Sequence, residues 1–102
     1  MTEKCTAVVS FNKTAIMRYI SHLDLLRLFQ RAARRARLKL SLTEGFNPHP
    51  KIKIEPAVKL GVEANNLTAE IVLDEIIQPE DLKEMFMREL PGGIKITDVK
   101  II

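Results

Sequence analysis

Residues 21–50 have the sequence SHLDLLRLFQRAARRARLKLSLTEGFNPHP, which predicts a helix, a short strand and a stiff loop in succession. Ser21 is a good helix N-cap, and Asp24 places a carboxylate in the first turn of the helix that follows. Leucine, phenylalanine and alanine residues then recur at three- and four-residue spacing, so we expect an amphipathic helix from His22 to Arg37. Residues 38–42 alternate apolar and polar side chains, which predicts a strand.

The segment before this stretch begins with a strand. Cys5 to Phe11 alternates in polarity and is rich in β-branched residues, which favours a β-strand. Asn12-Lys13-Thr14 predicts a turn or a bulge. Residues 16–20 are apolar enough either to extend this strand or to double back, and the sequence does not choose between the two.

The segment after residue 50 supplies more strands and a second helix. Alternating polarity predicts strands at residues 52–60, 67–74 and 94–102. Pro56 cannot donate a hydrogen bond to a neighbouring strand, so we expect the first of these strands at a sheet edge. A helix should start at Pro79 and stop at Pro91-Gly92-Gly93. The last strand changes polarity pattern near Thr97-Asp98, which predicts a bulge.

Apart from the short strand at residues 38–42, the order of these elements is βαββαβ. This order is typical of a ferredoxin-like α+β fold, a two-layer sandwich in which two helices cover one face of an antiparallel sheet. A chain of 102 residues is long enough for one hydrophobic core and too short for two. We therefore expect residues 1–102 to form a single α+β domain.

The composition limits the class of protein. With 46% hydrophobic and 28% charged residues, the chain resembles ordinary soluble globular domains. No apolar run approaches the roughly 20 residues of a membrane-spanning helix, and no secretory signal is visible, so we expect a cytoplasmic protein without membrane contact. Cys5 is the single cysteine, which permits no internal disulfide and no zinc or iron–sulfur site of its own. We expect no cofactor.

Positive charge is concentrated in the first part of the chain. Residues 1–59 contain 12 Lys and Arg against 4 Asp and Glu, net +8, whereas residues 60–102 contain 4 against 9, net −5. On the first helix, one arc of about 100° collects arginines without intervening acids, namely Arg27, Arg31, Arg34 and Arg35. Their spacing suits contacts with successive phosphates, and arginine favours bidentate phosphate binding. The alternative is a solvated face that pairs with acidic residues of this chain or of a partner.

The loop Gly45-Phe46-Asn47-Pro48-His49-Pro50 continues this candidate surface. Its two prolines fix two φ angles and bias the residues before them to extended conformations, so the loop should be stiff. Phe46 is suited either to stack on a base or to cap the core. We include Phe46, Asn47, His49 and Lys51 with the helix arginines in the expected nucleic-acid or phosphate-binding surface.

His22 and His49 are the candidates for catalysis, since histidine titrates near the working pH. His22 projects toward the apolar side of the helix, which favours a partly buried histidine that hydrogen-bonds a neighbour. No motif places a nucleophile or a base beside either residue. A metal site built from His22, Asp24 and His49 is a further alternative, but its spacing matches no ligand pattern, so we predict no metal.

Three motifs occur here in a characteristic order: Ser21-His22-Leu23-Asp24-Leu25, the arginine and alanine run from Arg27 to Ala36, and the loop at residues 45–50. Together they resemble the radical-SAM-linked family DUF2344. Further similarity lies at Leu60-Gly61-Val62-Glu63 and at residues 90–94. The resemblance implies a radical SAM protein as partner, and members of nearly twice this length imply that the chain corresponds to an N-terminal half. The chain has no CxxxCxxC motif, so any radical chemistry belongs to the partner.

The leading hypothesis is an accessory domain that binds RNA or another polyanion through the basic helix and the loop. One alternative is a small, metal-independent enzyme that processes or modifies RNA with a histidine. Another is a protein-interaction module whose basic face contacts an acidic partner. Of these, the sequence favours a binding role over an enzymatic one for this chain alone.

Overall fold

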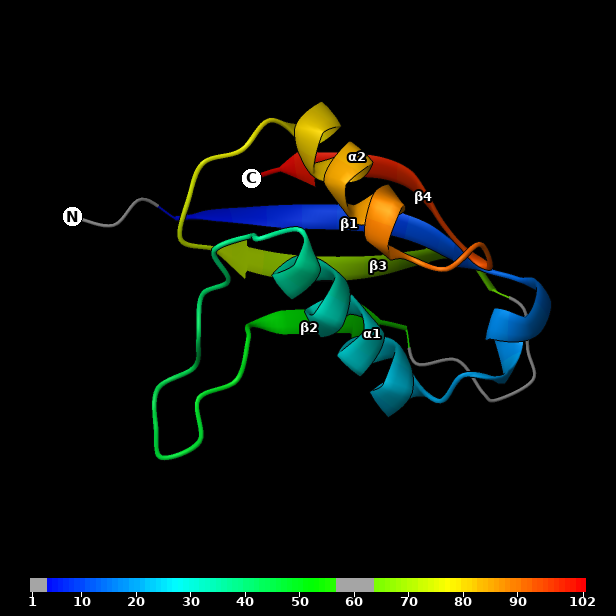
Figure 1. The fold of residues 1–102 in the computed structure, drawn as a ribbon, viewed down its shortest axis with the longest axis horizontal. Coiled ribbons are helices and arrows are strands. Elements are labelled where there is room, and N and C mark those ends of the chain that lie inside the picture. The colour runs from blue at the N-terminus through cyan, green and yellow to red at the C-terminus, as the bar shows by residue number, and fades with distance from the viewer. Residues whose placement is uncertain (1–3, 57–63) are drawn as a thin grey trace.

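A four-stranded antiparallel sheet forms one layer of the protein, and two helices cover one of its faces (Figure 1). The computed structural model describes residues 4–56 and 64–102. The elements in chain order are β1 (Cys5–Lys13), the 3₁₀ helix η1 (Ala15–Tyr19), α1 (His22–Arg35), β2 (Ile52–Glu55), β3 (Ala64–Leu73), α2 (Pro79–Glu89) and β4 (Ile94–Ile101). The strand order β2-β3-β1-β4 confirms the predicted ferredoxin-like α+β sandwich.

The hydrophobic core lies between the sheet and the two helices. Every second residue of β1 is buried on this side, while the residues between them are only partly buried on the other side. The ring of Phe11 on β1 lies 4.8 Å from the ring of Phe29 on α1, which in turn lies 5.9 Å from Phe86 on α2. These tilted contacts join α1 to the sheet and α2 to α1, in the geometry that aromatic pairs prefer.

The connection from β1 to α1 differs from both predicted alternatives. β1 runs on to Lys13, and its register with β3 shifts after Phe11, which confirms a bulge there. The next residues form η1, so they neither extend the strand nor double back as a hairpin. Ser21 then caps α1 as predicted, because its side chain accepts a hydrogen bond of 3.1 Å from the backbone N–H of Asp24.

α1 ends at Arg35, two residues before the predicted end at Arg37. The N–H of Leu38 donates to the carbonyl of Ala33, and the N–H of Arg37 donates to that of Arg34, each at 3.0 Å. This is the hydrogen-bond pattern of a Schellman motif, in which Arg37 takes the left-handed position with φ 60° that glycine usually occupies. Neither α1 nor any other helix in the described parts of the chain is long and apolar enough to span a membrane.

Residues 38–42 do not form the predicted regular strand. They make isolated antiparallel bridges, from Leu40 to Leu73 and from Leu42 to Pro50. Ser41 donates its N–H to Val72 and accepts from the N–H of Lys51, each at 2.9 Å. The segment thus changes partner after a single residue, from β3 to the far side of the following loop, which prevents a continuous ladder.

β2 lies at an edge of the sheet, as predicted from its proline. It ends at Glu55, directly before Pro56, which has no N–H to donate. The predicted continuation of this strand over residues 57–60 lies outside the described residues, as does the whole motif at residues 60–63. At the other edge, Thr97 is the extra residue of a bulge in β4, which confirms the expected irregularity.

Candidate nucleic-acid interface

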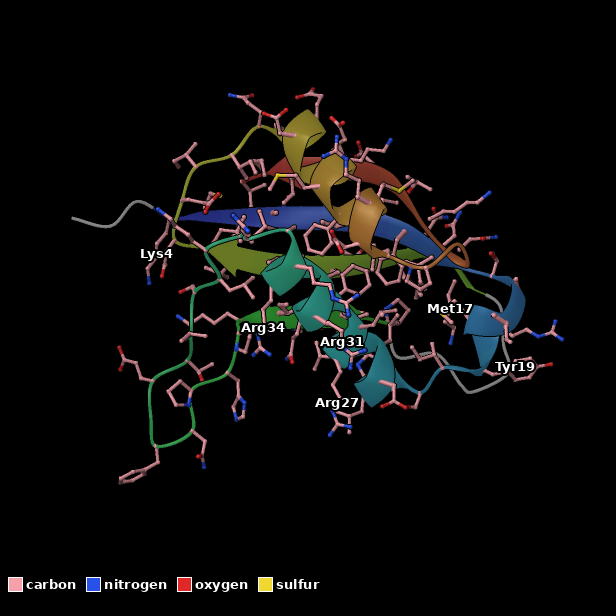
Figure 2. All side chains as sticks on the ribbon, in the orientation of Figure 1. Lys4, Met17, Tyr19, Arg27, Arg31 and Arg34 are labelled. Atoms are coloured by element: carbon pink, nitrogen blue, oxygen red, sulfur yellow. The ribbon has the colours of Figure 1, made fainter. Side chains whose placement is uncertain are left out.

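The outer side of α1 exposes a row of arginines. Its inner side is buried against the sheet through Leu25, Phe29, Ala32 and Ala33. The exposed arginines are Arg27, Arg31, Arg34 and Arg35, which we call the arginine face. Figure 2 shows Arg27, Arg31 and Arg34 in succession along the helix. The sequence periodicity therefore predicted both sides of α1 correctly.

The arginine face carries more positive charges than there are carboxylates beside it. Nη1 of Arg27 lies 3.6 Å from Oδ1 of Asp24, so the expectation of a face without acids is wrong. Among residues 4–56 and 64–102, no carboxylate lies within ion-pair distance of Arg31, Arg34 or Arg35. Like charges at three- and four-residue spacing on a helix repel each other. A bound polyanion would relieve this repulsion.

A surface hollow of about 310 Å³ lies beside the arginine face and is lined by Ile20, Asp24, Arg27, Leu28 and Arg31. Ile20 and Leu28 are partly buried and pack against the core, so they give the hollow apolar walls. Asp24 was expected in the helix cap and, as an alternative, in a metal site with His22 and His49, but not in the binding surface. Its three-residue distance from Arg27 was the signal that it also lies on the arginine face.

Residues 43–49, which we call the 43–49 loop, are joined at their two ends by two hydrogen bonds. The N–H of Thr43 donates to the carbonyl of His49 at 2.8 Å, and the N–H of His49 donates to Oγ1 of Thr43 at 2.9 Å. Below this pair, the N–H of Val72 on β3 donates to the carbonyl of Lys51 at 3.0 Å. The loop extends beyond the β2 edge of the sandwich (Figure 1). These hydrogen bonds hold the base of the loop in place and connect it to β3.

The tip of the 43–49 loop presents its side chains to solvent. Phe46 is 105% exposed, so the interpretation of this residue as a cap on the core is wrong. Asn47 and His49 are exposed as well, and Lys51 is exposed at the base of the loop. Gly45, with φ +129°, takes a conformation that side-chain-bearing residues rarely adopt and lets the chain turn before Phe46.

The predicted binding residues therefore fall into two groups, the arginine face and the 43–49 loop with Lys51 at its base. In the described residues, no hydrogen bond or ion pair joins the two groups. Both lie on the β2 side of the molecule, since α1 covers β2 and β3 and the loop projects past β2 (Figure 1). Their joint action on one ligand stays a prediction.

The two histidines lie in different surroundings. His22 is partly buried at the start of α1, and His49 is exposed on the loop. No hydrogen bond joins either imidazole ring to another described residue, so the predicted hydrogen bond of His22 to a neighbour is not found. No group of three His, Cys, Asp or Glu side chains within the described ranges is close enough to hold a metal ion, which includes the set of His22, Asp24 and His49.

The face of the sheet opposite the helices is uncovered and forms a contrasting surface. One of its lysines lies between two acids: Nζ of Lys53 is 2.8 Å from Oε1 of Glu55, and Glu70 is directly opposite Lys53 on β3. The hydrogen bond and the charge of Glu55 raise the pKa of Lys53. Phe11 is the one aromatic residue in the described strands, and it is buried on the helix side, so the described strands lack the stacking aromatics that RNA-binding sheets use on this face.

Comparison with curated proteins and with solved structures gives no match. Comparison with protein families gives a match over residues 7–102 to a family described as "Uncharacterized protein conserved in bacteria (DUF2344)". The matched range includes the arginine face, the hollow and the 43–49 loop. Because the match covers nearly the whole chain, the protein belongs to the DUF2344 family.

Proposed function

We propose that this protein is an accessory domain that binds single-stranded RNA through the arginine face and the 43–49 loop. The observation that carries the proposal is the absence of any acidic partner for Arg31, Arg34 and Arg35 among the described residues. A row of guanidinium groups without partners has its donors available for phosphate oxygens, and guanidinium binds these in bidentate geometry.

Both groups of residues have a role in this proposal. The arginines neutralise successive phosphates and release the counterions of the strand, which supplies affinity without sequence preference. Phe46 stacks on an unpaired base, since every base offers an aromatic face to an exposed ring. Because stacking on Phe46 needs an unpaired base, these roles favour a single strand over a duplex, in which the bases are stacked on each other.

Lysines on the uncovered sheet face provide a control variant that matches the loss of charge in a variant of the arginine face. Lys95 and Lys100 are exposed there, opposite Asn12 and Val8 of β1. Arg31→Ala/Arg34→Ala and Lys95→Ala/Lys100→Ala remove the same charge from opposite faces of the protein. A general effect of net charge must therefore be similar in the two double variants, whereas a local contact affects one of them.

The experiment is a fluorescence anisotropy titration of labelled oligo(U) RNA at several salt concentrations. For the arginine double variant we expect about tenfold weaker binding and a log–log salt slope that is smaller by about 1.4, because each lost phosphate contact removes about 0.7. The lysine double variant should keep the wild-type slope. Binding that is independent of salt, equal losses in both variants, or no binding at low salt would contradict the proposal.

A further inference from the structure

The hollow beside the arginine face contains a group that a pure phosphate site would not have. Besides Arg27 and Arg31, it is lined by Asp24, an acidic residue whose side chain ends in a carboxylate. A carboxylate repels phosphate and only accepts hydrogen bonds. If the ligand offered phosphates alone, Asp24 would weaken its binding.

The Asp24 carboxylate still has room for a hydrogen bond. Its Oδ1 lies 3.6 Å from Nη1 of Arg27, which is longer than an N–H···O hydrogen bond. The cap of α1 uses the backbone N–H of Asp24 and the side chain of Ser21, so it leaves this carboxylate unused. No donor among the described residues hydrogen-bonds the carboxylate. A ligand that fits the hollow should therefore bring a donor of its own.

An RNA strand carries such a donor beside each phosphate, namely the ribose 2′-hydroxyl. Residues three and four positions apart on a helix have Cβ atoms about 5–6 Å apart, so Asp24, Arg27 and Arg31 form neighbouring contact points. A strand that places phosphates on the arginines brings a ribose next to Asp24. The aliphatic walls from Ile20 and Leu28 suit the C–H groups of the sugar.

We infer that the hollow is a ribose subsite in which the Asp24 carboxylate accepts a hydrogen bond from the 2′-hydroxyl of a bound RNA strand. This inference rests on the proposed RNA binding and adds a preference for RNA over DNA to it. The hollow of about 310 Å³ has room for a sugar. The 2′-hydroxyl is the group by which a protein distinguishes the two nucleic acids at a given site.

Three strands of equal length test the inference: oligo(U), oligo(dU) and 2′-O-methyl oligo(U). They share one base without an exocyclic amino group, and they differ only at the 2′ position. Because a carboxylate needs a hydrogen to accept, the methylated strand should bind like the deoxy strand. We expect wild-type protein to bind oligo(U) about five- to tenfold more tightly than the other two strands, as for one hydrogen bond to a charged group at an exposed site.

Asp24→Ala and Asp24→Asn separate the hydrogen bond from the charge. Asp24→Ala removes the acceptor, so all three strands should bind alike, whereas Asp24→Asn keeps an acceptor oxygen and should retain part of the preference. Urea denaturation checks that both variants fold. An equal rise in affinity for all three strands in both variants would show that Asp24 acts only as a negative charge and would overturn the inference.

The two proposals fail in different ways. If wild-type protein binds oligo(U) and oligo(dU) equally, the ribose subsite is wrong while RNA binding stands. If no strand binds at low salt, the proposed function is wrong, and the subsite with it.

Discussion

The arginine face of α1 and the uncovered face of the sheet both carry basic side chains, but they differ in how closely the unpaired charges are spaced. On the sheet, Lys53 forms an ion pair of 2.8 Å with Glu55 and lies opposite Glu70. On α1, Asp24 pairs with Arg27, and the remaining arginines have no carboxylate nearby among the described residues. Lys95 and Lys100 on the sheet also have no ion pair among the described residues, so the close helical spacing of the unpaired arginines, rather than the lack of a partner alone, locates the candidate interface.

The two surfaces also differ in what lies beside the charge. The arginine face adjoins a hollow with apolar walls, and the 43–49 loop presents a fully exposed Phe46 on the same side of the molecule. The described part of the uncovered sheet face has no exposed aromatic ring. The helix side therefore offers guanidinium groups that suit phosphates, apolar walls that suit sugars and an exposed ring that suits bases.

Charge reversal should give the largest difference in RNA affinity between variants of the two faces. Arg31→Glu/Arg34→Glu removes two phosphate contacts and adds two repulsions, so we expect the affinity for oligo(U) to fall on the order of 100-fold at low salt. Lys95→Glu/Lys100→Glu makes the same change in net charge on the sheet, and its loss should be only a few-fold. Anisotropy titrations measure both. Similar losses in the two variants would mean that net charge alone determines binding.

Phe46→Ala should have the next largest effect. Loss of stacking on one base weakens binding of single-stranded RNA by about tenfold. The salt slope should stay unchanged because no charge is removed, and the free energy of unfolding should stay unchanged because the ring is fully exposed. Phe46→Trp is the matched control and should keep the affinity. A lower urea midpoint for Phe46→Ala would instead assign the ring a structural role.

Arg37→Gly tests whether an arginine just after α1 contributes less to RNA binding than an arginine of the arginine face. Arg37 occupies the left-handed position after the helix and is not part of the arginine face. Glycine adopts this conformation without a Cβ clash, so the variant should gain up to about 1 kcal/mol in the free energy of unfolding. Its affinity for RNA should fall less than that of Arg31→Ala. Urea denaturation measures the first effect, and a lower midpoint would contradict the Schellman motif.

Lys53→Met should have the smallest effect, because both side chains of its ion pair are largely exposed to solvent. RNA affinity should not change. The pKa of Lys53 is raised above its usual 10.5 in the folded protein, so the pair stabilises the fold below that pH and the contribution is lost as the pH rises through the raised pKa. Any deficit of the variant in urea denaturation should thus be present at neutral pH and vanish in strong alkali. A deficit that persists there would have another cause.

Much of the fold follows from local rules in the sequence. The cap at Ser21, the apolar periodicity of α1 and the proline beside β2 each predicted the observed element, because each depends on neighbouring residues only. The end of α1 could not be predicted, since Arg37 in a left-handed position has no sequence signal of the kind that glycine provides. The irregular path of residues 38–42 depends on Val72 and Lys51, which are distant partners that alternation does not reveal.

The candidate site was predicted in part for the same reason. Helical spacing placed the arginines on one side of α1 correctly. The ion pair of Asp24 with Arg27 was missed because a carboxylate in the first turn already has a local explanation. The exposure of Phe46 was left undecided, since a lone aromatic between turn residues has no periodicity to show which way it points.

RNA binding by α1 and the 43–49 loop is tested most directly by a titration of the isotope-labelled protein with oligo(U), in which the backbone amide shifts are followed by NMR. We expect the largest shift changes in α1 between Asp24 and Arg35 and in the 43–49 loop. We also expect that the uncovered sheet face, represented by Thr6, Val8 and Lys100, changes little. The largest changes on that sheet face, with α1 unaffected, would contradict RNA binding by α1 and the loop.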